Sequence, residues 1–125
     1  MDNFNIRLNK IKNILDLFSN ESYLTQIDQS IEIITKTLKK SLPVLVCGNG
    51  GSASDAQHIA GELVGKFLKE RRALNVKALT TDTSVITAWA NDESYDTIFS
   101  RQVEAYGQLG GVLWGISTSG NSRNV

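Results

Sequence analysis

The nine residues Val44–Ser52, VLVCGNGGS, place a short apolar run directly before a glycine-rich turn. Such a run is typical of a strand that is buried on both faces, as the strands of a parallel sheet are. Glycines let the backbone approach an anion closely, and the free N–H groups at the start of a following helix point at it. We therefore predict a strand, a turn and a helix here, with an anion-binding site at the turn.

Two further short apolar runs, at 76–79 and 112–116, predict two more strands. Amphipathic stretches between the three runs predict helices at 53–68, 84–90 and 98–106. Strands that alternate with helices are typical of a parallel sheet with helices on both faces. The sequence thus predicts an α/β domain over residues 42–125. Because the chain stops at Val125, where a covering helix is expected, we expect this fold to be incomplete at its C-terminus.

Before this domain, apolar residues recur at spacings of three and four in two stretches, 4–18 and 24–38. The pattern predicts two amphipathic helices with a break at Asn20-Glu21, and Leu42-Pro43 ends the second helix. We expect a helical hairpin over residues 1–41. Its narrow apolar stripe suits packing either on its own domain or on another subunit.

The bulk composition excludes several classes of protein. The chain has 125 residues, enough for one modest domain, with 13 basic and 13 acidic side chains. A formal net charge of zero gives no electrostatic preference for nucleic acid or for an anionic membrane. No apolar run approaches the ~20 residues that span a bilayer. Without a secretory signal, and with one cysteine, the chain is expected in the cytoplasm.

A second small-residue turn, Ser117–Ser122, follows the third predicted strand. Ligands bind at the carboxyl ends of parallel strands, so two such turns favour a small phosphorylated ligand. Gly48-x-Gly50-x-x-Ala53 also satisfies the dinucleotide-binding fingerprint. However, the acidic residue expected about 20 residues further on is absent, since Asp82 lies 34 residues after Gly48. A nicotinamide or flavin cofactor is therefore the weaker interpretation.

His58 and Glu62 are four residues apart, so both lie on one face of the helix that begins at the first turn. An imidazole and a carboxylate make half of a divalent-metal site, with zinc the leading candidate. Glu62 could equally be a general base, and the two could form an ordinary ion pair on a solvated face. The residues alone leave these alternatives open.

Other polar residues have plainer interpretations. Ser52 with Asp55 has the arrangement of a helix N-terminal cap, and Asp82 is placed to cap the next helix. Asn91-Asp92 is expected to form a turn that separates two helices. Arg71 lies in what we interpret as a solvated helix end.

Three blocks of sequence, CGNGGSASDAQHIAGELVGKF, TTDTSVITAWANDESYDTIFSRQVEAYG and GVLWGISTSGNSRNV, resemble the sedoheptulose 7-phosphate isomerases, or phosphoheptose isomerases, of the sugar-isomerase (SIS) fold. The resemblance covers about residues 40–125. It implies a three-layer α/β/α, flavodoxin-like fold and a cytoplasmic homotetramer with bound zinc. The implied reaction converts sedoheptulose 7-phosphate to D-glycero-D-manno-heptose 7-phosphate, for lipopolysaccharide core or other surface glycans. It also implies active sites at subunit interfaces.

The resemblance also assigns roles to individual residues. It implies that His58 and Glu62 are metal ligands and that Glu62 contacts the reacting sugar, where we expect it to act as the base. The implied substrate-binding positions are Asn49, Gly50, Gly51, Asn91 and Asp92, followed by the phosphate-binding positions Ser117, Thr118, Ser119 and Ser122. In the family a glutamine and a histidine near the C-terminus complete the metal site, and this sequence ends before that region. A non-catalytic SIS protein that acts by binding other proteins, of the replication-initiator-associating type, is the alternative. Those proteins have a small residue where the isomerases have the glutamate, so Glu62 favours the enzyme.

Overall fold

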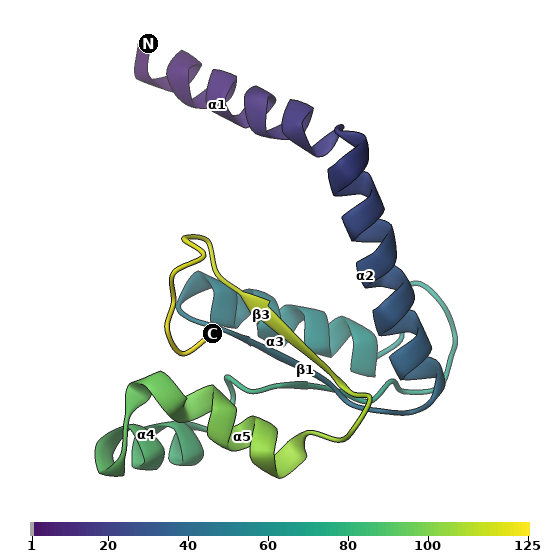
Figure 1. The fold of residues 1–125 in the computed structure, drawn as a ribbon, viewed down its shortest axis with the longest axis vertical. Helices are drawn as coiled ribbons and strands as arrows, with labels where there is room; N and C mark the ends of the chain where they lie inside the picture. The colour runs from purple at the N-terminus through teal and green to yellow at the C-terminus, as the bar shows by residue number, and fades with distance from the viewer. Residues whose placement is uncertain (1) are drawn as a thin grey trace. The chain divides into compact units, whose positions relative to one another are not determined.

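The computed structural model of the protein describes residues 2–125 (Figure 1). Helices and strands alternate after two N-terminal helices, as the apolar pattern predicts. In chain order the elements are α1 (Asp2–Phe18), α2 (Glu21–Lys39), β1 (Val44–Gly48), α3 (Gly51–Val64), β2 (Val76–Ala78), α4 (Thr83–Asp92), a short 3-10 helix η1 (Tyr95–Thr97), α5 (Ile98–Tyr106) and β3 (Val112–Ile116).

The three strands form one parallel sheet in the order β2-β1-β3. Strand β1 is central, so that Val44 pairs with Val76 on one side and with Val112 on the other. All five residues of β1 are buried, which accounts for its uninterrupted apolar sequence. The predicted parallel sheet is confirmed.

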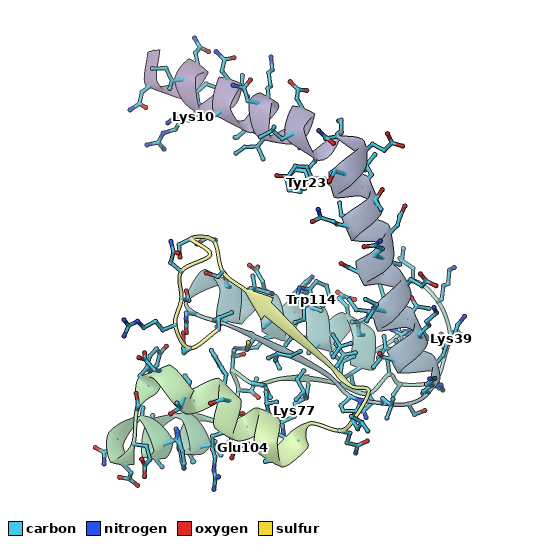
Figure 2. All side chains as sticks on the ribbon, in the orientation of Figure 1. Lys10, Tyr23, Lys39, Lys77, Glu104 and Trp114 are labelled. Atoms are coloured by element: carbon cyan, nitrogen blue, oxygen red, sulfur yellow. The ribbon has the colours of Figure 1, made fainter. Side chains whose placement is uncertain are left out.

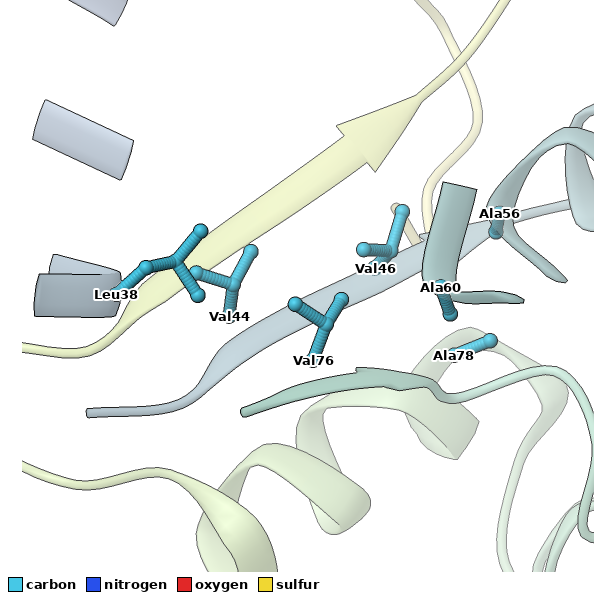
Figure 3. Close-up of a cluster of buried hydrophobic side chains, with 7 residues drawn as sticks. All are labelled: Leu38, Val44, Val46, Ala56, Ala60, Val76 and Ala78. Carbon is cyan, nitrogen blue, oxygen red and sulfur yellow. The ribbon is translucent and has the colours of Figure 1, made fainter. Parts of the chain in front are cut away.

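Alternate residues of β1 face two different hydrophobic clusters, one on each side of the sheet. Val44 and Val46 pack with Ala56 and Ala60 of α3, in the cluster drawn in Figure 3. On the opposite side the cluster comprises Leu45, Cys47, Leu79, Ile98 and Phe99, together with partly buried residues of α4 and α5. Helices therefore cover both faces of the sheet, and the predicted three-layer α/β/α arrangement is confirmed.

The N-terminal helices cover the two stretches that the spacing predicts. The chain divides into two compact units between Ile33 and Ile34, inside α2, whereas the boundary expected from the sequence follows residue 41. The difference arises because Thr37 and Leu38, in the last turns of α2, are buried in the second unit.

Within the first unit the apolar side chains are exposed (Figure 2). They are Phe4, Ile6, Leu8, Ile11, Ile14, Leu15, Leu17, Phe18, Tyr23, Leu24, Ile27, Ile31 and Ile33. The rings of Phe18 and Tyr23 meet at the junction of α1 and α2, with centroids 5.9 Å apart. A hairpin in which the two helices pack along their lengths stays a prediction. Over residues 2–125, no helix combines the length and apolar character needed to cross a membrane.

Candidate functional site

Strands β1 and β3 end side by side, because Gly48 is paired with Ile116 at the last position of the ladder. From β1 the chain crosses to β2 on one side, and it reaches β3 on the other side. In an open α/β sheet the connections diverge at such a point and leave a crevice in which ligands bind. The two turns predicted to bind an anion, Asn49–Gly51 and Ser117–Ser122, both begin here. The structure therefore brings them together.

Two glycines give the first turn its shape. A Cβ atom on Gly48 would lie 2.8 Å from the Cβ and the carbonyl oxygen of Ser52, so only a glycine lets the first turn of α3 approach the end of β1 so closely. Gly50 has φ 55° and ψ −121°, a conformation that other residues rarely adopt. Helix α3 consequently begins at Gly51, two residues earlier than predicted. The predicted Ser52–Asp55 cap is wrong, because Gly50 holds the cap position and Ser52 is already buried inside the helix.

The side chain of Asn49 joins three segments of the chain at the crevice. Its Nδ2 donates to Asn124 Oδ1 at 2.8 Å, and Asn124 Nδ2 donates back to Asn49 Oδ1 at 2.9 Å. The hydroxyl of Tyr95, on η1, donates to the same Oδ1 at 2.9 Å. Asn49 was predicted from the sequence as a site residue, whereas its partners Tyr95 and Asn124 were not. Their only signal was that each lies in a loop expected near the same edge of the sheet.

The second turn collects three serine hydroxyls. Ser117 Oγ lies 3.1 Å from Ser122 Oγ and 3.5 Å from Ser119 Oγ. The backbone N–H of Gly120 donates to Ser117 Oγ, and that of Asn121 donates to Ser119 Oγ, each at 3.1 Å. Thr118 is exposed in the same turn. This compact group of hydroxyls can donate hydrogen bonds to the oxygens of a phosphate.

His58 and Glu62 lie on one face of α3, as the spacing predicts. His58 Nε2 is 3.7 Å from Glu62 Oε1, and the two side chains are 77% and 39% exposed. Two ligands of a tetrahedral zinc ion are about 3.3 Å apart, so the pair fits half of such a site with a small adjustment. Within residues 2–125 no group of three or more His, Cys, Asp or Glu side chains could hold a metal ion. A metal ion held by His58 and Glu62 would therefore need further ligands from elsewhere in the protein.

Within one chain Glu62 lies far from the two turns. Helix α3 starts at the crevice, and Glu62 follows Gly51 by eleven residues, a rise of about 16 Å along the helix axis. The residues predicted to form one site therefore fall into two groups, one at the crevice and one towards the far end of α3.

Asn91 and Asp92 are the last two residues of α4, and Glu93 is the C-cap, so the pair lies inside the helix and not in the turn predicted to separate two helices. Both are exposed, and Asn91 Nδ2 donates to Asp92 Oδ1 at 2.7 Å. The structure links this segment to the crevice through Tyr95, three residues after Asp92, which contacts Asn49.

The predicted cap at Asp82 is confirmed. Its Oδ1 accepts a hydrogen bond of 3.1 Å from the backbone N–H of Val85, in the first turn of α4. The acidic residue that follows β2 is therefore engaged in a helix cap, which weakens the dinucleotide interpretation further.

Comparison with known proteins places this geometry in a family. The model of the SIS domain family matches residues 8–125, and the chain belongs to this family. Among curated relatives, a phosphoheptose isomerase of Aquifex aeolicus is 59% identical over 105 residues, which are 84% of this chain and 55% of the relative. That of Clostridium acetobutylicum is 56% identical over 103 residues, 82% of this chain and 53% of the relative. The chain thus spans little more than half the length of these relatives.

Solved structures give the same result for the fold. The phosphoheptose isomerase of Neisseria gonorrhoeae is 42% identical and superposes with a TM-score of 0.79, covering 99% of this chain and 65% of that one. The enzyme of Francisella tularensis is 35% identical with a TM-score of 0.75, covering 94% and 65%. The predicted SIS fold is confirmed.

Proposed function

We propose that the protein is a phosphoheptose isomerase, which interconverts sedoheptulose 7-phosphate and D-glycero-D-manno-heptose 7-phosphate. The observation that carries the proposal is the pairing of Gly48 with Ile116, which sets the glycine turn beside the serine turn in one crevice. Relatives that bear this name at 56% and 59% identity support the choice of substrate. The heptose would serve lipopolysaccharide core or other surface glycans, and the enzyme would work in the cytoplasm.

The two turns bind different parts of the substrate. Ser117, Ser119 and Ser122 hold the phosphate, since the hydroxyl of Ser117 lies within 3.5 Å of the hydroxyls of the other two in a single loop. Asn49–Gly51 contacts the sugar at the adjacent strand end, and Asn91 and Asp92 do so from the end of α4. Thr118 completes the phosphate turn. Contacts at the phosphate end contribute binding energy that orients the reacting carbons.

Glu62 is the proposed base. Isomerisation between an aldose and a ketose moves a proton between C1 and C2 through an enediol. A carboxylate can take the proton from one carbon and return it to the other. Glu62 is 39% exposed on α3, so it is accessible to a substrate and yet partly shielded from water. A non-catalytic SIS protein would not need this carboxylate.

We propose that His58 and Glu62 hold a zinc ion together with ligands from elsewhere in the protein. Zinc at this position would polarise the oxygens of the reacting sugar. The 3.7 Å separation of His58 Nε2 and Glu62 Oε1 supports this assignment. Metal analysis of the purified whole protein should find zinc, and His58→Ala should lower the zinc content severalfold. Equal zinc in both would contradict the assignment.

The distance between Glu62 and the start of α3 supports a proposed homotetramer. Glu62 lies about 16 Å along the helix from the start of α3, so the turns of one subunit would work with Glu62 of another. The exposed apolar side chains of α1 and of α2 up to Ile33 supply surface for association. Refolding a Glu62→Gln variant together with a Ser119→Ala/Ser122→Ala variant should give more activity, at substrate concentrations well below the wild-type KM, than the two variants refolded separately. No such gain would place both groups in a site within one subunit.

The principal test is the conversion of sedoheptulose 7-phosphate by the whole protein. Glu62→Gln should abolish turnover while substrate still binds, as measured by isothermal titration. Glu104→Gln is the control, because Glu104 is exposed on α5 and pairs with Arg101. Retained turnover in Glu62→Gln would exclude Glu62 as the base. A wild type that binds NAD but not the sugar phosphate would overturn the proposed function.

A further inference from the structure

The carboxamide of Asn49 is held from two directions. Its Oδ1 accepts from Tyr95 and from Asn124, while its Nδ2 donates to Asn124. An amide oxygen has two lone pairs and an amide nitrogen has two N–H groups. The acceptor capacity of Asn49 is therefore filled, and a single N–H remains for a ligand.

A second contact joins the same two segments. Arg123 and Asp96 are the immediate neighbours of Asn124 and Tyr95, and Arg123 Nη1 lies 3.8 Å from Asp96 Oδ2. Both side chains are largely exposed, so the ion pair adds little stability. Its consequence is geometric. Two successive residues of the 3-10 helix η1, Tyr95 and Asp96, contact the side chains that connect it to the chain after the serine turn.

We propose that Tyr95 and Asn124 are positioning residues, which hold Asn49 in the orientation that binds the sugar. This inference rests on the proposed function, in which Asn49 contacts substrate. Two donors on Oδ1 decide which way the carboxamide faces, so the remaining N–H is oriented before the substrate arrives. A group that is already ordered loses less conformational entropy on binding. The Asn49–Asn124 bonds also tie the glycine turn to the chain that follows the serine turn.

Steady-state kinetics of the whole protein with sedoheptulose 7-phosphate tests this inference. Tyr95→Phe removes one hydrogen bond and should raise KM about 3- to 10-fold. Asn124→Ala removes two and should raise KM about 10- to 100-fold. In both variants kcat should stay within about threefold of wild type, because neither residue contacts the reacting carbons.

The Asn49→Ala background separates positioning from a general structural role. Without Asn49 there is no carboxamide to orient, so Tyr95→Phe and Asn124→Ala should change KM by less than about twofold in this background. Matched controls are Tyr106→Phe, on α5, and Asn75→Ala, whose side chain bonds Ser41 at the opposite edge of the sheet. Both controls should keep the wild-type KM.

Two results would overturn the inference: a wild-type KM in both variants, or effects that persist undiminished in Asn49→Ala. A wild type that does not turn over the sugar phosphate would instead remove the proposed function. In that event, NMR hydrogen exchange of the Asn49 side-chain amide still tests the positioning. Exchange should be at least about tenfold faster in Asn124→Ala than in wild type, and unchanged exchange would exclude Asn124 as a positioning residue.

Discussion

Arg71 Nη2 donates a hydrogen bond of 2.9 Å to the backbone carbonyl oxygen of Glu62. Its Nη1 donates a second bond of 2.9 Å to the carbonyl oxygen of Leu63. Carbonyl groups in the last turn of a helix lack donors within the helix, and a cation there also interacts favourably with the helix dipole. The interpretation of Arg71 as part of a solvated helix end is therefore wrong. Arg71 caps the turn that carries the proposed base.

The first prediction follows from this cap. Arg71→Ala should lower the free energy of unfolding by about 1–2 kcal/mol, because two carbonyl groups lose a charged donor. Urea denaturation measures the change. Lys69→Ala is the control, since Lys69 is an exposed cation in the same loop, and it should stay within about 0.5 kcal/mol of wild type. Equal losses in the two variants would show that net charge, not capping, is responsible.

The second prediction concerns the two glycines at the start of α3. Gly50→Ala should destabilise the fold by about 1–3 kcal/mol, because alanine is strained at φ 55°. Gly51→Ala should be neutral or slightly stabilising, because Gly51 is the first helical residue and a Cβ there meets nothing within 4 Å. Thermal denaturation of both variants compares them. A loss in Gly51→Ala as large as in Gly50→Ala would contradict the argument from backbone conformation.

The third prediction tests the phosphate turn. Ser119→Ala and Ser122→Ala should each raise KM about 3- to 10-fold, since each removes a hydroxyl that can donate to the phosphate. Ser100→Ala is the control, because Ser100 Oγ donates to the carbonyl of Thr97 on an exposed part of α5. Kinetics with sedoheptulose 7-phosphate gives the comparison. An unchanged KM in both turn variants would place the phosphate elsewhere.

The fourth prediction uses the buried thiol of Cys47. Burial at the end of β1 raises the pKa of this thiol. The folded state therefore holds the proton more tightly than the unfolded state, and this stabilisation is present at neutral pH and lost as pH rises. Between about pH 7.5 and about pH 10, wild type should lose more unfolding free energy than Cys47→Ala. The same loss in both would show that the thiol does not contribute.

The strands and the helices that cover the sheet were predictable from the sequence because burial produces their periodicity. Strand β1, buried on both faces, is apolar without interruption, and the predicted strand at 112–116 has the observed bounds of β3. The start of α3 was not predictable. Its sequence has the serine pattern of a helix cap, but the close approach of Ser52 to Gly48 places Ser52 inside the helix instead. A local motif cannot report a contact that tertiary packing creates.

The candidate site, too, was only partly predictable from the sequence. The two turns could be placed at one edge of the sheet because both follow parallel strands, and their adjacency then depended on a strand order that no local pattern specifies. Tyr95 and Asn124 were not foreseen, because their bonds to Asn49 span 46 and 75 residues. The distance between Glu62 and the turns follows from helix length, which the spacing of His58 and Glu62 does not reveal.

The central place of β1 also has a kinetic consequence. Val44 pairs with Val76, 32 residues away in the sequence, and with Val112, 68 residues away, so we expect the second pairing to form more slowly. Contacts between distant residues are slow to form, because the intervening chain must be ordered first. We therefore expect the crevice between β1 and β3 to form late in folding. A ligand that fits it binds only the finished molecule and draws the folding equilibrium towards that state.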